Sequence, residues 1–143
     1  MTKENRRSVK LERIGNGAFK AINSRGGEIT MLDTPESFSP VELLLAGVAG
    51  CSAVDVDIFT ARRSEPTEFE VTASGEKVST GGNHLEDIEV VFHVRFPVGE
   101  GGDAAREILT KSITDSRDRL CTVSRTVQLP TTVTYFEDDV ALD

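Results

Sequence analysis

Two cysteines are the residues of this chain best suited to chemistry. Cys51 and Cys121 are the only cysteines among its 143 residues. They lie too far apart for a CxxC redox motif or for a zinc site of ordinary cysteine spacing. His84 and His93 fall on opposite faces of an expected strand, so they predict no shared metal site. We therefore expect thiol chemistry without a metal or another cofactor.

Each sulfur also has a second interpretation. Cys51 can be a small apolar side chain in the core, as buried free cysteines commonly are. Cys121 can be a half-buried loop residue with no chemical role. The functional interpretation depends on the thiolate, which is the nucleophilic form. Arg119 and Arg125 are close enough to Cys121 in sequence to favour that form.

Cys51 lies in a helix that is expected to run over residues 40–63. A capping box formed by Ser39 and Glu42 marks its start. The run that follows is apolar on all sides, and such a helix is buried all round. Gly47 and Gly50 each cost about 1 kcal/mol of helix propensity. This cost indicates the close approach of another backbone or room for a ligand.

The other elements are mostly strands. Glycine turns separate three short segments, and two longer segments alternate apolar with polar residues. A second helix is expected after Asp103, its cap, and Cys121 comes just past its end. The expected ranges are strands at 8–14, 18–23, 28–32, 69–79, 85–96 and 125–136, and a second helix at 104–119. The order β-β-β-α-β-β-α-β predicts one α+β domain over residues 1–143, with loose ends at 1–7 and 137–143.

Composition limits the classes of partner. The net charge of -8 argues against nucleic-acid binding, which needs a basic surface. No apolar run is expected to reach the ~20 residues that span a bilayer. The first residues lack the hydrophobic stretch of a secretory signal. We expect a cytoplasmic protein, and in that compartment disulfides are rare unless they are catalytic or redox-sensing.

Two motifs resemble those of the OsmC/Ohr family. Residues 39–51, SPVELLLAGVAGC, resemble its central-helix motif, and residues 120–127, LCTVSRTV, resemble its second-cysteine motif. The order of segments between them also matches. This resemblance implies an OsmC-like α+β fold that forms an intertwined homodimer. In such a dimer, central buried helices lie between antiparallel sheets, and the active sites lie at the subunit interface.

The same resemblance implies a reaction. In the family's peroxidases, the residue matching Cys51 attacks an organic hydroperoxide and becomes a sulfenic acid. The residue matching Cys121 resolves it to a disulfide, which a dithiol reductant, typically lipoyl-linked, then reduces. A sulfenic acid beside a resolving thiol is a reversible stage of cysteine oxidation. The expected function is defence against oxidative stress.

Four further residues are candidates for supporting roles. The family's peroxidases carry a glutamate directly after the motif proline, where this chain has a valine. Glu42 comes one residue later, and capping is its expected role. An activating arginine lies near the family's first β-turn, a place that Arg13 and Arg25 flank here. Asp55 shares a helix face with Cys51 and would raise the pKa of its thiol. This pattern favours the OsmC-like branch of the family.

Other functions stay open on these residues. A non-catalytic binding protein would hold an apolar small molecule at the dimer interface, near Cys51. A carrier of acyl or persulfide groups would use the thiol without any peroxide. Peroxide turnover would distinguish the peroxidase from both of these alternatives.

Overall fold

The computed structural model describes residues 5–143. Backbone contacts divide the chain into two compact units, Met1–Leu44 and Leu45–Asp143. The interpretation as a single domain stays a prediction. Residues 1–4 of the expected loose N-terminus lie outside the described residues.

The first unit contains a small antiparallel sheet. Its strands are β1 (Val9–Gly15), β2 (Ala18–Asn23) and β3 (Glu28–Met31), in the order β1-β2-β3. Gly17 and Gly26 take φ values of 70° and 88° in the two turns, which glycine adopts without strain. The three short strands predicted from the glycine turns are thereby confirmed.

The helix α1 (Pro40–Ala61) begins as predicted. The N–H of Ser39 donates to Oε1 of Glu42 at 2.8 Å, and the N–H of Glu42 donates to Oγ of Ser39 at 3.2 Å. These reciprocal bonds are the predicted capping box. The bonds from the Ser39 backbone and side chain lower the pKa of the Glu42 carboxyl.

The prediction that α1 is buried all round is wrong for the single chain. Only one stripe of the helix is fully buried, namely Val48, Ser52, Val56 and Thr60. Val54 and Ile58, on other faces, are 57% and 48% exposed. The chain covers one side of the helix and leaves several apolar side chains on its other faces largely exposed.

α1 also departs from the expectation that no segment could span a bilayer. Within residues 5–143, this helix of 22 residues is long and apolar enough to cross a membrane by length and composition. This is weak evidence, because a core helix of a globular protein passes the same test.

The second unit is built on a long hairpin of β4 (Glu68–Val78) and β5 (His84–Arg95). Phe69 pairs with Val94 and Val71 with Phe92, so the apolar residues of both strands share one face. This confirms the period of two that predicted these strands. The rings of Phe69 and Phe92 meet edge to face, with centroids 6.5 Å apart.

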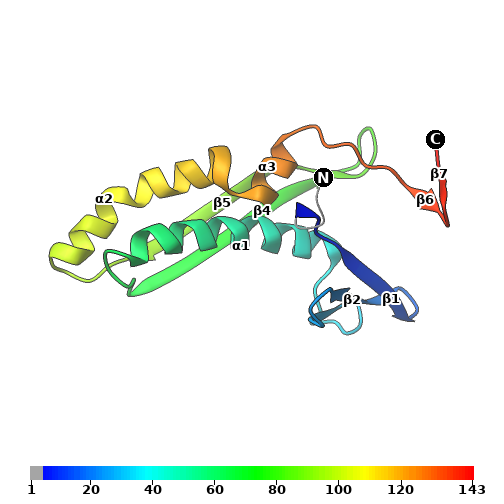
Figure 1. Cartoon of the computed structure of the whole chain (residues 1–143), viewed down its shortest axis with the longest axis horizontal. Helices are drawn as coiled ribbons and strands as arrows, with labels where there is room; N and C mark the ends of the chain where they lie inside the picture. The colour runs from blue at the N-terminus through cyan, green and yellow to red at the C-terminus, as the bar shows by residue number, and fades with distance from the viewer. Residues whose placement is uncertain (1–4) are drawn as a thin grey trace. The chain divides into compact units, whose positions relative to one another are not determined.

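The helix α2 (Glu100–Asp115) packs on this face and continues into a short π-helix, η2 (Ser116–Leu120). Ala105 of α2 is fully buried against Val94 and Phe96. Figure 1 shows α1 and α2 both lying along the β4–β5 hairpin.

The prediction that Asp103 caps α2 is wrong. The helix starts earlier, after Gly99, and Asp103 lies in its first turn, where it pairs with Arg106. The reason is a close approach that only glycine permits. A Cβ at Gly102 would collide with the carbonyl oxygen of Pro97. Without that Cβ, the helical turn can form directly on the preceding loop.

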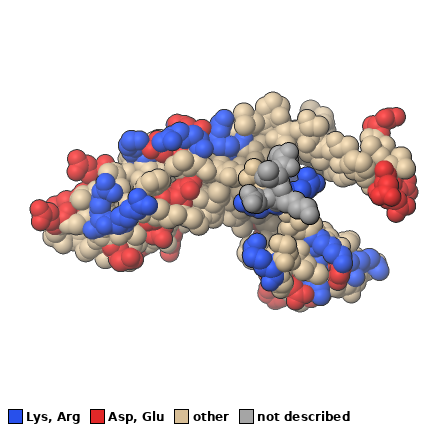
Figure 2. All heavy atoms as spheres, in the orientation of Figure 1, with Lys and Arg blue, Asp and Glu red and all other residues tan. Residues whose placement is uncertain are grey.

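The predicted strand over residues 125–136 is also wrong. The chain forms α3 (Thr122–Gln128), then an irregular stretch, and ends in the short pair β6 (Phe136–Glu137) and β7 (Val140–Ala141). The tail from 137, expected to be loose, thus contains all of a small hairpin except its first residue, Phe136. Figure 2 shows acidic atoms gathered on this tail. The observed order is β-β-β-α-β-β-α-η-α-β-β, within the predicted α+β class.

Candidate dithiol site

Cys51 and Cys121 lie side by side within the unit Leu45–Asp143. Cys51 is half-buried on α1, and Cys121 is 0% exposed at the junction between η2 and α3. The Cys121 side chain is within hydrogen-bonding reach of the Cys51 thiol. The fold therefore brings together two free thiols from distant parts of the sequence, one accessible and one enclosed.

Two backbone groups of α3 face the Cys51 sulfur. The N–H groups of Val123 and Thr122 hydrogen-bond it and lower the pKa of its thiol. Burial opposes them as the largest effect, and the neighbouring Cys121 also acts to raise this pKa. The balance leaves the pKa of Cys51 above its ordinary value of 9.0. At neutral pH, the Cys51 thiol is therefore protonated in most molecules.

Cys121 has a structural role besides its nearness to Cys51. Its sulfur accepts a hydrogen bond from the N–H of Ser124 at 3.3 Å and so caps α3. Its own N–H donates to the carbonyl of Ser116 at 2.9 Å, closing the π-turn. These two bonds hold the residue between the end of one helix and the start of the next.

Asp55 does not act as predicted. It accepts a hydrogen bond from Oγ of Ser116 at 2.8 Å. The pKa of Cys51 is raised, as expected, but burial is the main cause, and Asp55 is not among the groups that shift it. The carboxylate instead joins α1 to the start of η2.

The other supporting candidates have partners of their own. Glu42 is held in the capping box, and Arg13 donates to Oδ1 of Asn16 at 3.1 Å. Arg25 belongs to the turn before β3, where its N–H donates to the Asn23 side chain. A role for any of them at the thiols stays a prediction.

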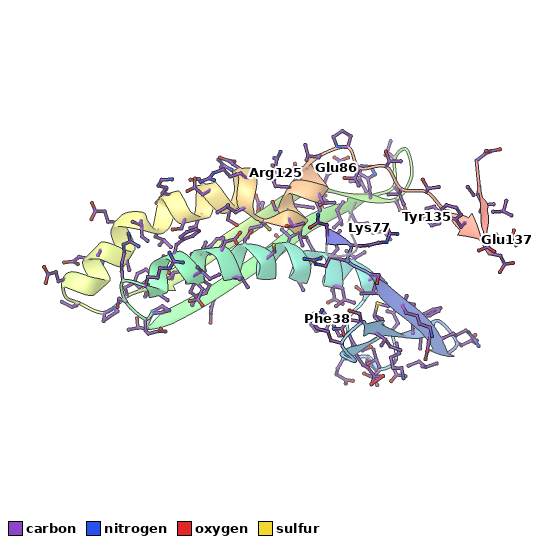
Figure 3. All side chains as sticks on the ribbon, in the orientation of Figure 1. Phe38, Lys77, Glu86, Arg125, Tyr135 and Glu137 are labelled. Atoms are coloured by element: carbon purple, nitrogen blue, oxygen red, sulfur yellow. The ribbon has the colours of Figure 1, made fainter. Side chains whose placement is uncertain are left out.

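The arginines near Cys121 in sequence interact with carboxylates, one by an ion pair and one through its charge. Arg119 pairs with Asp115 at 3.5 Å. Arg125 projects from α3 (Figure 3), and its charge helps, after that of Arg117, to lower the pKa of Asp118. Acidic side chains thus largely offset the positive charge that the sequence indicated near Cys121.

A cavity of about 440 Å³ lies between α1, β5, the end of α2 with η2, and α3, and its lining residues include neither cysteine. Its walls are mainly apolar, with Arg117, Gln128 and two serines as polar groups. The full lining is Val48, Ser52, Ile88, Val90, Phe92, Ile113, Arg117, Ser124, Val127 and Gln128. Ser52 follows Cys51 in the sequence, and Ser124 donates its N–H to the sulfur of Cys121, so the cavity adjoins residues next to both thiols.

The glycines of α1 were predicted to allow a close approach or a ligand. A Cβ on Gly47 would stand 3.6 Å from Cγ1 of Val123, which is ordinary contact, while one on Gly50 would meet nothing within 4 Å. Gly47 therefore faces α3 next to the thiols, and Gly50 lies open. No group of three metal-ligating side chains occurs within residues 5–143.

Three contributors were not foreseen from the sequence. The N–H groups of Thr122 and Val123 carry no side-chain signal, and they reach Cys51 only because α3 is a helix. Ser116 sits in an ordinary polar run, and nothing near it in sequence indicates that its hydroxyl meets Asp55. The one related signal in the sequence was the placement of Asp55 on the same face of α1 as Cys51.

Fold and site together define an α+β protein that presents a paired thiol between its long central helix and a short C-terminal helix. The profile of the OsmC family, described as OsmC-like protein, matches residues 33–136, and the chain belongs to this family.

Solved structures share the fold. A hypothetical protein from Aquifex aeolicus superposes with a TM-score of 0.71 at 25% identity, over 87% of this chain and 88% of that one. An OsmC-like protein from Mycoplasma pneumoniae gives a TM-score of 0.65 at 17% identity, over 87% and 89%. OhrB of Bacillus subtilis, an organic hydroperoxide resistance protein, gives 0.50 at 16% identity, over 83% and 90%. No curated protein sequence matches this chain.

Proposed function

We propose that this protein is a thiol-dependent peroxidase that reduces organic hydroperoxides. The observation that carries the proposal is the pairing of a half-buried Cys51 with a fully enclosed Cys121. An accessible thiol next to an enclosed one suits a division into an attacking and a resolving sulfur. Family membership supports it, since OhrB of Bacillus subtilis is described as an organic hydroperoxide resistance protein.

The proposed reaction has three steps. The Cys51 thiolate attacks the outer oxygen of ROOH, the O–O bond breaks, and a proton converts the leaving alkoxide to ROH. The Cys121 sulfur then attacks the Cys51 sulfenic acid, forming the disulfide and releasing water. A dithiol of the lipoyl type reduces this disulfide to two thiols and is itself oxidised to a cyclic disulfide.

The surroundings of the site support an organic substrate. The cavity that reaches Ser52 and Ser124 offers Val90, Phe92 and Val127 as apolar walls for the carbon part of a hydroperoxide. The N–H groups of Thr122 and Val123 would stabilise the Cys51 thiolate as it forms. We place this chemistry in the cytoplasm, where thiol reductants are abundant.

We infer that the working form is a homodimer. Val54 and Ile58 on α1 are about half exposed in the single chain, and Gly50 lies open between them and the helix start. A second copy covering this side would bury apolar area that a chain of this size leaves in water. Sedimentation of a Gly50→Trp variant tests this: a dimer should be weakened, and a monomer unaffected.

A second candidate function is non-catalytic binding. The cavity of about 440 Å³ favours it, because that volume suits a small apolar ligand whether or not the thiols react. Native mass spectrometry of the purified protein would show such a ligand as a constant added mass. A thiol used as an acyl or persulfide carrier would instead leave a covalent adduct on Cys51.

Counting free thiols tests the peroxidase. One equivalent of cumene hydroperoxide should remove both thiols of each chain, and dihydrolipoamide should restore them. Cys51→Ser should abolish peroxide consumption, whereas Cys121→Ser should still consume one equivalent and leave a sulfenic acid that dimedone traps. If both thiols survive a moderate excess of the hydroperoxide, the protein is not a peroxidase.

A further inference from the structure

We propose that the hydrogen bond between Asp55 and Ser116 is a positioning contact that sets the alignment of Cys121 with Cys51. A role of this contact in catalysis rests on the proposed peroxidase function. Its role in aligning the two thiols does not, because that alignment can be measured without any peroxide.

On α1, helical spacing brings Cys51 and Asp55 to the same face. Cys51 and Asp55 are four residues apart, so they lie on one face of the helix, one turn from each other. Both point to the segment that joins α2 to α3. Cys51 meets Cys121 there, and Asp55 meets Ser116 at 2.8 Å.

In the facing segment, Ser116 and Cys121 are five residues apart. The N–H of Cys121 donates to the carbonyl of Ser116 at 2.9 Å, which closes one turn of the π-helix η2. An α-helical turn from Ser116 would end at Leu120, not at Cys121. The extra residue of the π-turn therefore places a sulfur where an ordinary helix would place leucine. Single π-turns are frequently found at functional sites.

The contact is enclosed enough to hold this alignment. Ser116 is 0% exposed, so water does not compete for its hydroxyl. A hydroxyl donating to a carboxylate makes a stronger bond than one between two neutral groups. Across the 61 residues that separate the pair, this bond ties α1 to η2 one turn from the thiols. Slippage of η2 along α1 would have to break it.

Alignment matters for the second chemical step. The Cys121 sulfur must approach the Cys51 sulfenic sulfur along the line of its S–O bond, so that the S–S bond forms while water leaves. Holding reacting atoms in place raises their effective concentration, and small misplacements lower it strongly. Asp55 and Ser116 touch neither substrate nor sulfur here, so they are positioning residues and not catalytic ones.

The experiment measures the effective concentration of the two thiols by equilibrating the full-length protein with reduced and oxidised glutathione. We expect Ser116→Ala and Asp55→Ala each to lower this value about tenfold, as expected for the loss of one hydrogen bond to a charged group. Asp55→Asn keeps an oxygen that accepts from Ser116 in a weaker, neutral bond, so it should lose clearly less than Asp55→Ala. The double variant Asp55→Ala with Ser116→Ala should lose no more than either single one.

Ser112→Ala is the matched control. Ser112 is also buried and lies one turn before Ser116, but its hydroxyl bonds the carbonyl of Ile108 in its own helix, at 2.8 Å. This variant should leave the effective concentration unchanged. If Ser116→Ala fails to fold, the contrast between Asp55→Ala and Asp55→Asn carries the test.

Two results would overturn the proposal. One is an unchanged effective concentration in both alanine variants, and the other is an equal loss in Ser112→Ala. The outcome is separate from that of the proposed function. If the alanine variants lose alignment but the unsubstituted thiols ignore hydroperoxide, the positioning contact stands and the peroxidase proposal fails.

Discussion

The helix α1 and the segment from Ser116 to Gln128 each supply one thiol, but they acquire their structures in different ways. α1 starts at a capping box within four residues of sequence and continues through an uninterrupted apolar run. The later segment changes from π-helix to α-helix around Cys121, and distant partners hold it. Asp55 binds its first residue, and the thiol of Cys51 meets it at the turn.

This difference shows where the site is robust and where it is adjustable. Cys51 sits on an element that local interactions already favour, so its position depends little on the rest of the site. Cys121 sits where a few hydrogen bonds decide the backbone path. The reactivity and the alignment of the pair should therefore respond most to changes in the later segment.

The largest expected effect is the pH dependence of Cys51. Because its pKa lies above 9.0, its alkylation by iodoacetamide should rise about tenfold per unit between about pH 6 and pH 8, without levelling off. Cys121 contributes to the raised pKa, so Cys121→Ser should move the midpoint to lower pH. The urea-unfolded chain gives the reference profile. A plateau already at neutral pH would contradict the structure.

The second prediction compares packing in the two regions. Val56 on α1 is 0% exposed, and Val56→Ala should lower the free energy of unfolding by about 2 kcal/mol. Val127 on α3 is 42% exposed, and Val127→Ala should change it by less than about 0.5 kcal/mol. Urea denaturation measures both. Equal losses would mean that α3 is packed as firmly as α1 and would remove the contrast.

A third effect, smaller than that of Val56→Ala, is expected at Gln128. Its amide donates to the carbonyl of Arg117 at 3.1 Å and to Oγ of Ser124 at 2.9 Å, fastening α3 to η2. Gln128→Ala should cost about 1 kcal/mol or less. Hydrogen exchange should quicken in α3 while α1 stays protected. Faster exchange in both helices would show that they open together.

The regular parts of the fold were accessible from the sequence. Alternation at Ile88, Val90 and Phe92 predicted β5, and Ser39 with Glu42 predicted the start of α1. In both cases the signal and the structure lie within a few residues of each other. The α+β class could be predicted for the same reason, because it follows from the order of these locally determined elements.

The C-terminal third could not be predicted in the same way. Val123, Thr126 and Val127 are β-branched, and such residues favour strands in isolation. They form a helix here because Cys121 caps it and the Thr126 hydroxyl bonds the carbonyl of Thr122 at 2.7 Å. The contact between Ser116 and Asp55 was equally hidden, because only tertiary structure brings the two together.

The unequal enclosure of the two sulfurs has a consequence for damage and repair. Excess oxidant arriving from solvent would convert Cys51 to sulfinic or sulfonic acid, while Cys121, with 0% exposure, would be spared. A bulky redox protein would likewise find only one sulfur within reach. Irreversible oxidation would therefore accumulate at the sulfur of Cys51, and mass spectrometry of aged protein could measure it at that residue.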